Sequence, residues 1–213
     1  MPTPADTKSR ILDAAEALFA EHGFPATSLR AVTAAADANL AAVHYHFGSK
    51  EALFRAVFER RLAPMNAARM ARLDALEGTH PALEQILEAF LRPALELIQQ
   101  PDGRRFMRLA ARIDEPGEHW KPVITQFDEV RQRFLAALRR ALPGLPVEAL
   151  FWRTHFMIGA LCHTLGDTYR LRFVSDSLCD PTDVETALHH LLPFAAAGFR
   201  AALPTTAAGP ATT

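Results

Sequence analysis

A cluster of aromatic, histidine and lysine side chains near the N-terminus has the composition of a phosphate-binding surface. It consists of His44, Tyr45, His46, Phe47 and Lys50. His44, Tyr45 and Lys50 offer hydrogen-bond donors to phosphate oxygens, and a helix that begins at Lys50 would add the positive end of its dipole. Phe47 is expected in the hydrophobic core, and His46 fits a structural hydrogen bond better than a ligand contact.

The segment before this cluster predicts two short helices joined by a tight turn. The first helix is expected from Ser28 to about Ala36, with Thr27 as its N-cap, and the second from Asn39 through Tyr45. N-cap side chains of these types accept a hydrogen bond from an otherwise unpaired amide of the first turn. Asp37 falls in the turn, where it tolerates a left-handed backbone better than most residues.

Two short helices joined by three or four residues make a helix-turn-helix, whose second helix enters the DNA major groove. Ala41 and Ala42 are small enough to allow close approach to base edges. From Phe24 to Arg61 the chain has five basic and three acidic residues, a charge of +2 inside a chain of −1. DNA contact is therefore expected from a local patch rather than from bulk charge.

Residues from about 7 to 60 resemble the TetR family of transcriptional regulators. The motifs that carry the resemblance are Ile11-Leu12-Asp13-Ala14-Ala15, Phe19, Gly23-Phe24, Thr27, Leu29, Tyr45-His46-Phe47 and Ser49-Lys50-Glu51-Ala52-Leu53. The resemblance implies that Thr27, His44, Tyr45 and Lys50 contact phosphates, and that Asn39, Leu40 and Ala41 lie nearest the bases.

The sequence departs from the family pattern at three positions. Asp37 stands where the family usually has glycine, and His44 where tyrosine is commoner. Leu40 occupies a position that is often polar in relatives. A leucine here indicates an apolar base contact and leaves the operator sequence open.

The whole chain is predicted to be all-α, with an N-terminal helix-turn-helix domain and a C-terminal helical bundle, about nine helices in total. We expect the domains at 1–50 and 51–203 and a disordered tail at 204–213. Pro64 should end or kink the helix from Lys50, and Pro93 should kink another. The nine expected helices are 7–22, 28–36, 39–45, 50–64, 80–99, 103–113, 121–141, 147–173 and 182–203.

The central helices supply candidates for an apolar effector pocket, although each such residue is more often simple core than pocket. The apolar candidates are Phe106, Met107, Phe127, Phe134, Phe151 and Phe156. Arg105, Arg112 or His155 could meet a carboxylate or carbonyl. Asn39–Val43 and the Leu192-Pro193-Phe194 region also resemble a fatty-acid-responsive branch of the family, which implies a small hydrophobic effector, with an acyl chain as one candidate.

The family resemblance also implies a homodimer through residues 147–173 and 182–203. In the last expected helix, apolar rows and small residues would permit close helix packing, although an intramolecular core would give the same pattern. The row comprises Leu188, Leu191, Leu192, Ala195, Ala196 and Phe199.

Composition and motifs argue against other classes of protein. Hydrophobic residues make up 49% of 213 residues, which allows a sizeable core, and two cysteines support neither a disulfide framework nor a thiolate zinc site. There is no Gly-rich phosphate loop, Gly-x-Ser-x-Gly elbow or His-Glu-x-x-His motif, so neither an enzyme nor a cofactor is expected. A metal site using His155, His163 or Asp167 is less favoured than a local pairing of His163 with Asp167.

No apolar run is long enough to span a bilayer, and the first ten residues are polar. We therefore expect a cytoplasmic homodimeric repressor that binds operator DNA and is released by an effector. The alternative is a helical ligand-binding or interaction protein that does not bind DNA.

Overall fold

The fold is built from helices that bury one apolar face each. The computed structural model describes residues 4–100, 102–110, 121–166 and 169–203, and within them no strand occurs. The helices are α1 (Pro4–Ala26), α2 (Leu29–Ala35), α3 (Leu40–Phe47), α4 (Lys50–Asp74), α5 (Leu83–Leu97), α6 (Gly103–Ala110), α7 (Lys121–Ile124), the 3₁₀ helix η2 (Thr125–Phe127), α8 (Asp128–Ala141), α9 (Val147–Gly166), α10 (Arg170–Val174) and α11 (Val184–Arg200).

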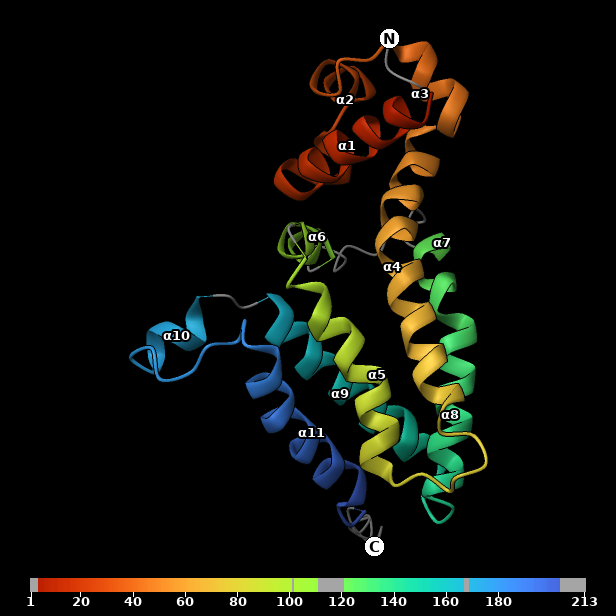
Figure 1. Ribbon diagram of the computed structural model, residues 1–213, viewed down its shortest axis with the longest axis vertical. Helices are drawn as coiled ribbons and strands as arrows, with labels where there is room; N and C mark the ends of the chain where they lie inside the picture. Colours follow the sequence, from red (N-terminus) through yellow and green to blue (C-terminus); the bar gives the residue numbers. More distant parts are fainter. Residues whose placement is uncertain (1–3, 101, 111–120, 167–168, 204–213) are drawn as a thin grey trace, which may run out of the picture.

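The three N-terminal helices pack around a small core against the first turns of α4 (Figure 1). Ile11, Phe19, Val32 and Val43 are fully buried. The rings of Phe19 and Phe54 meet edge to face with centroids 5.1 Å apart, which joins α1 to α4.

Side-chain caps fix where the short helices begin. The side-chain oxygens of Ser28, Asn39 and Ser49 accept hydrogen bonds from the backbone amides of Ala31, Ala42 and Ala52 respectively, at 2.8 to 3.1 Å. The caps at Asn39 and Ser49 agree with the sequence prediction, whereas the predicted cap at Thr27 is wrong by one residue. Thr27 instead points inward.

The turn between α2 and α3 has the predicted left-handed residue. Asp37 has φ of 47°, and its carboxylate accepts from Arg10 of α1 at 3.4 Å. The departure from glycine at this position therefore leaves the turn intact.

Helix α4 joins the N-terminal helices to the rest of the chain (Figure 1). Pro64 lies inside it, and the helix continues for ten residues to Asp74. The prediction that Pro64 could end the helix is therefore wrong, and burial of Leu62 and Met65 on either side shows that packing holds this stretch helical. Pro93 likewise lies within α5.

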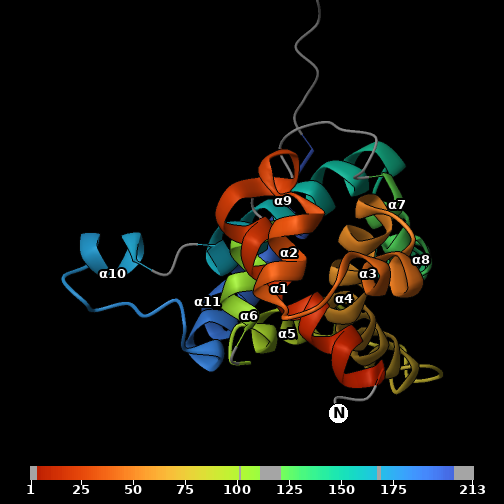
Figure 2. The same cartoon turned by 90° about the horizontal axis from the view of Figure 1, so that it is seen from above.

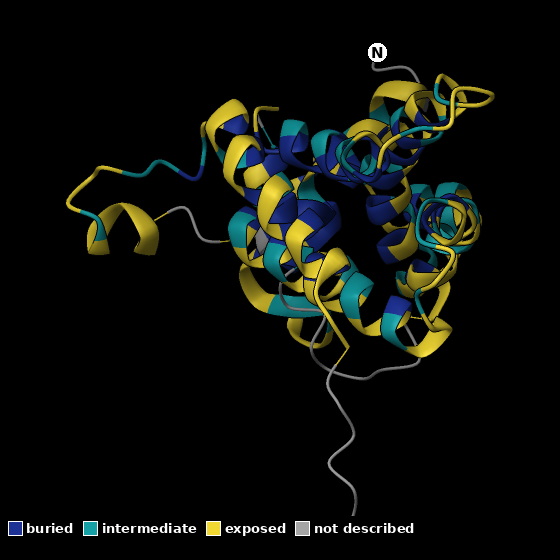
Figure 3. Cartoon of the chain, turned by 90° about the horizontal axis from the view of Figure 1, so that it is seen from below, coloured by how far each residue is buried: buried dark blue, intermediate teal, exposed yellow. Residues whose placement is uncertain are grey.

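The C-terminal part packs α4, α5, α8, α9 and α11 around one apolar interior, while α10 stands away from the bundle (Figures 1 and 2). Figure 3 shows buried residues facing the interior of the bundle and exposed residues along α10. Two helices predicted as single elements are divided, since 147–173 contains α9 and α10 and 121–141 contains α7, η2 and α8. These divisions account for the difference from the nine helices expected.

Other predictions concern residues outside the described ranges, namely the tail 204–213 and the end of the helix expected at 103–113. The structure also leaves the domain division at residue 50 as a prediction, because α4 begins there and packs against both parts. None of the described helices has the length and apolar character needed to cross a membrane.

Candidate DNA-binding surface and ligand cavity

Helix α3 presents a continuous exposed face beside the N-terminus of α1. Asn39, Leu40, Ala41, His44 and Tyr45 are all exposed, and the Tyr45 side chain is 83% exposed. Val43, by contrast, is fully buried and anchors the helix. The predicted base-contacting and phosphate-contacting residues of α3 therefore lie on an accessible surface of a rigid helix.

His44 is held by a hydrogen bond within its own turn. Its Nδ1 lies 2.9 Å from the carbonyl oxygen of Gly48. Because a carbonyl only accepts, Nδ1 carries a proton in this arrangement. Nε2 of His44 can then donate to a phosphate only when the ring is protonated on both nitrogens.

Lys50 has an intramolecular position that the sequence did not indicate. Its Nζ donates to the carbonyl oxygen of Pro25 at 3.3 Å and lies 4.4 Å from the centre of the Phe24 ring. Desolvation lowers the pKa of Lys50, and the charge of Glu51 opposes this effect. Lys50 thus fastens the end of α1 to α4, and its remaining ammonium protons are available to a phosphate.

Thr27 does not offer its hydroxyl to the surface. The residue is 3% exposed, and its hydroxyl donates toward the carbonyl oxygens of Gly23 at 2.8 Å and Leu18 at 3.1 Å. The prediction of a phosphate contact from this side chain is therefore not supported by its geometry. Ser28 and Arg30 are exposed beside it, and the sequence reasoning assigned neither of them to the site.

His46 and Phe47 of the aromatic cluster are half-buried. Phe47 packs against the core, as expected, and the His46 ring lies 5.0 Å from Tyr45 and 6.1 Å from Phe47 between centroids. His46 therefore supports the aromatic neighbours on both sides of it.

A buried ionic network ties α1 to α4. Glu16 is 1% exposed and accepts from Arg60 at 2.6 Å and from Arg61 at 2.9 and 3.0 Å. Arg60 also pairs with Asp13 at 2.6 Å, and Arg61 with Asp102 at 3.3 Å. Since Asp102 immediately precedes α6, the network links three helices between the DNA-binding surface and the bundle.

Helix α6 approaches α5 more closely than any side chain would allow. A Cβ atom on Gly103 would lie 1.7 Å from the carbonyl oxygen of Leu97. Glycine at the start of α6 is thus a steric requirement, and it brings Phe106 to within 5.1 Å of Phe58 between ring centroids.

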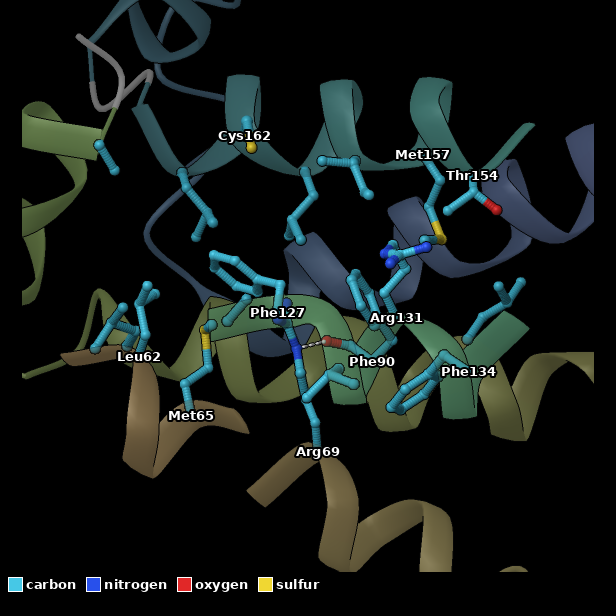
Figure 4. A pocket seen from close by; sticks show the side chains of 18 of the residues that line it. Leu62, Met65, Arg69, Phe90, Phe127, Arg131, Phe134, Thr154, Met157 and Cys162 are labelled. Atoms are coloured by element: carbon cyan, nitrogen blue, oxygen red, sulfur yellow. Dashed lines mark hydrogen bonds between the residues drawn. The ribbon is translucent and has the colours of Figure 1, made fainter. Parts of the chain in front are cut away.

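An apolar cavity of about 390 Å³ lies inside the bundle (Figure 4). Its walls come from α4, α5, α6, α8 and α9, with single residues from α7 and η2. Of the predicted effector residues, Phe106, Met107, Phe127 and Phe134 line it.

Several other predicted effector residues lie elsewhere. Phe151, His155 and Phe156 are exposed on the outer face of α9, so their assignment to the cavity is wrong. Arg105 also lies outside the lining and pairs with Asp102 at 3.4 Å. Arg112 is outside the described residues.

The sequence reasoning missed the polar residues that do line the cavity. These are Arg69 of α4, Arg131 of α8, and Thr154 and Cys162 of α9. The signal for Arg69 is present in the sequence, because it continues the apolar stripe formed by Phe58, Leu62, Met65 and Leu73 at helical spacing.

Arg69 is the only one of these residues whose charged group is deeply buried within the described chain. It is 3% exposed, and burial lowers its pKa to about 10, with the nearby Cys162 opposing this effect. Its Nε donates to the carbonyl oxygen of Phe90 at 2.9 Å, and its guanidinium lies 3.9 Å from the centre of the Phe90 ring.

The apolar rows of α11 are part of the core of a single chain. Leu188, Ala195, Ala196 and Phe199 are between 2 and 5% exposed, mainly against α5. Their interpretation as a dimer interface is therefore wrong. The exposed aromatic residues of this region are Phe151, Trp152, Phe156 and Phe194, at 50 to 68% exposure.

Among the described residues, no group of three His, Cys, Asp or Glu side chains is arranged to hold a metal ion. His163 lies in α9, and Asp167, its predicted partner, is outside the described residues.

Comparisons with known proteins identify two family regions. Residues 11–57 match the family described as bacterial regulatory proteins of the tetR family, and residues 88–198 match the tetracyclin repressor-like C-terminal domain. The repressor BepR of Brucella suis is 31% identical over 134 residues, 62% of each chain. AcnR of Corynebacterium glutamicum is 35% identical over 85 residues, which cover 40% of this chain and 43% of AcnR. The chain therefore spans less than two thirds of the length of either relative.

Solved structures share the whole fold. NalD, the secondary repressor of the MexAB-OprM multidrug efflux pump in Pseudomonas aeruginosa, superposes with a TM-score of 0.65 at 25% identity, covering 91% of this chain and 95% of NalD. A Clostridium perfringens putative fatty acid metabolism regulator gives 0.65 at 17% identity, covering 86% and 97%, and shares the fold alone. We conclude that the chain belongs to the TetR family.

Proposed function

We propose that the protein is a homodimeric cytoplasmic repressor whose α3 reads an operator and whose cavity binds a small hydrophobic effector. The observation that carries this proposal is the pairing of an exposed, rigidly anchored α3 with an apolar cavity in the same chain. Asn39, Leu40 and Ala41 would lie nearest the bases, while His44, Tyr45 and Lys50 would contact phosphates. Phosphate contacts fix the register of the protein and base contacts supply its specificity.

The second copy would pack against the outer face of α9. Phe151, Trp152 and Phe156 on α9 and Phe194 on α11 are exposed, the rings of Trp152 and Phe156 are stacked, and exposed apolar side chains that cluster in this way mark protein interfaces. Helix-turn-helix dimers bind half-sites about 34 to 36 Å apart, so the relative placement of two α3 helices decides operator affinity.

Helix α6 and the Glu16 network would couple the cavity to the DNA-binding helices. Phe106 and Met107 line the cavity from α6, which also packs against α1. Asp102, at the start of α6, pairs with Arg61, which in turn binds Glu16 of α1. A ligand that displaces α6 would therefore shift α1, and effector and operator would oppose each other by about 1 to 3 kcal/mol. An acyl chain is one class of ligand that fits such an apolar cavity.

Operator binding tests the DNA-binding part of this proposal. Fluorescence anisotropy with DNA flanking the protein's own gene should show salt-dependent, sequence-specific binding. Tyr45→Phe removes one hydroxyl from a fully accessible ring and should weaken binding roughly tenfold, because a hydrogen bond to a charged group is lost. Tyr169→Phe removes the same atom from the residue that precedes α10 and should leave affinity unchanged. Equal affinities for wild type and Tyr45→Phe would contradict the phosphate contact.

The role of His44 can be tested by substitution. Nδ1 of His44 lies 2.9 Å from the carbonyl oxygen of Gly48, which leaves Nε2 as the atom that would face a phosphate. His44→Ala should therefore weaken operator binding, whereas His44→Tyr keeps a donor at this exposed position and should retain it. Equal affinities for wild type and His44→Ala would show that His44 makes no phosphate contact.

The alternative, a helical ligand-binding protein without DNA binding, would show no specific anisotropy change with any flanking DNA at low salt while still binding ligand in its cavity.

A further inference from the structure

The charge of Arg69 is unbalanced inside the cavity. Figure 4 shows its side chain rising from α4 into the space between Phe90 and Phe127. Among the described residues, no carboxylate lies within ion-pair distance of its guanidinium, and the cavity lining contains no acid.

The hydrogen-bonding capacity of Arg69 is only partly used. A guanidinium has five N–H donors. Nε donates to the Phe90 carbonyl oxygen at 2.9 Å, and Nη1 donates to Oδ1 of Asn66 at 3.4 Å. Three N–H groups thus have no acceptor among the described residues. These unused donors belong to a side chain that is 97% buried, since 3% is exposed.

Two other arginines that are largely buried do have carboxylate partners. Arg60 and Arg61, at 24 and 14% side-chain exposure, share the carboxylate of Glu16 and each has a second carboxylate partner. Burying a charge without a partner is costly, and a neutral amide side chain could have made the bond to the Phe90 carbonyl. The contacts of Arg69, two hydrogen bonds and the face of the Phe90 ring, therefore leave its charge without a counter-ion.

Arg131, the second arginine of the lining, is not a comparable site. It pairs with Asp128 at 2.9 Å, and its side chain is 51% exposed. Figure 4 shows its guanidinium beside Met157, away from Arg69. One end of the cavity thus has an uncompensated positive charge, and the surrounding walls are apolar.

We propose that the natural ligand is an apolar organic monoanion whose carboxylate pairs with two of the three free N–H groups of Arg69. This inference rests on the proposed function only in taking the cavity as the effector site. It specifies the chemistry of the ligand: an apolar body in contact with Phe127 and Phe134, and one negative group at the Arg69 end. Charge-assisted, two-pronged bonds between guanidinium and carboxylate are the strong form of this interaction.

Matched pairs of probes test the charge requirement without DNA. Thermal melting and calorimetry of the full chain would compare decanoate with decanol and 2-naphthoate with 2-naphthol. A ligand that binds the folded state alone raises the melting temperature by mass action. At least one carboxylate should bind roughly tenfold or more tightly than its neutral partner. Neutral partners that bind as tightly as the carboxylates, or carboxylates that fail to bind at millimolar concentration, would overturn the proposal.

Two variants and a control test whether Arg69 causes the preference for carboxylates over neutral probes. Arg69→Met should weaken carboxylate binding by about 10- to 100-fold while leaving the neutral partner bound as before. Arg69→Lys keeps a charge without the fork of donors and should retain part of the preference, which also covers the case in which Arg69→Met does not fold. Arg131→Met, in the same cavity, should retain the full preference. A preference that survives in Arg69→Met or disappears in Arg131→Met would refute the assignment to Arg69.

Ligand binding at Arg69 and release from the operator are tested separately. A carboxylate that binds through Arg69 but leaves operator affinity unchanged would confirm the anion site and contradict the proposed release mechanism. Release by neutral probes, with no preference for the carboxylates, would support the release mechanism and refute the anion site.

Discussion

Replacing Glu16 by glutamine should be the most damaging single-charge change on the α1–α4 contact. The substitution keeps the size of the side chain and removes the charge shared by Arg60 and Arg61. Glu16 is 1% exposed and accepts three hydrogen bonds from these two guanidiniums, so their loss leaves buried positive charges facing one another.

The expected loss can be worked from burial. Removing one partner of a fully buried ion pair costs about 3 to 5 kcal/mol. Here the arginines are 24 and 14% exposed, and each keeps one further carboxylate, Asp13 or Asp102, which reduces the loss to about 2 to 3 kcal/mol. For a chain of this size, that corresponds to a melting temperature lower by about 4 to 12 °C.

Urea unfolding at one fixed protein concentration measures this loss, since an oligomer's stability depends on concentration. Asp13→Asn is the matched control: Asp13 pairs with Arg60 but is 57% exposed, so its loss should stay within about 1 kcal/mol. High salt should leave the difference between the two variants nearly unchanged, because buried pairs are weakly screened. Equal midpoints for the two variants would refute the claim that burial makes the Glu16 pair strong.

Three further changes test other contacts. Gly103→Ala should destabilise the protein by about 1 to 3 kcal/mol or more in urea unfolding, because a Cβ would lie 1.7 Å from the Leu97 carbonyl oxygen; a stability equal to that of wild type would contradict the steric requirement. Phe156→Glu should produce a folded monomer in sedimentation if α9 forms the dimer interface, and a variant that remains dimeric would place the interface elsewhere. The hydrogen bond from Arg200 holds the pKa of Glu84 at about 2, below its usual 4.5, so the stabilisation is present above about pH 4.5 and is lost as the pH falls toward 2. Glu84→Gln should therefore unfold at lower urea than wild type near pH 5 and at nearly the same urea near pH 2, and a gap that does not close would contradict this linkage.

The N-terminal part could be predicted well because its signals are local. Caps at Asn39 and Ser49 and the left-handed Asp37 are fixed by interactions within four residues along the chain. The error at Thr27 has the same origin, since threonine and serine both cap helices. Thr27 turns inward because its hydroxyl donates toward the carbonyl oxygens of Gly23, four residues away, and Leu18, nine residues away, and Ser28 is left to cap α2.

The C-terminal part was harder to predict because its faces depend on tertiary packing. In α9 the largest aromatic residues, Trp152 and Phe156, face outward, while smaller residues such as Thr154 and Met157 face the cavity. A prediction from side-chain size alone therefore turns the wrong face of α9 toward the cavity. Residue type alone places Arg69 in solvent, because arginine is mostly exposed, and only its position on an apolar stripe indicates burial.

The unbroken helix α4 has a consequence for how the sequence of this protein can change. Lys50, beside the DNA-binding helices, and Arg69, in the cavity, are 19 positions apart on one helix, a separation of about 30 Å. Deleting one residue between them would turn the far half by about 100° and remove Arg69 from the cavity. A change of about seven residues would restore the facing but shift the DNA-binding helices by about 10 Å. The length and phase of α4 therefore fix how the α3 surface and the cavity are placed relative to one another, and a change of length would be better tolerated in the loops.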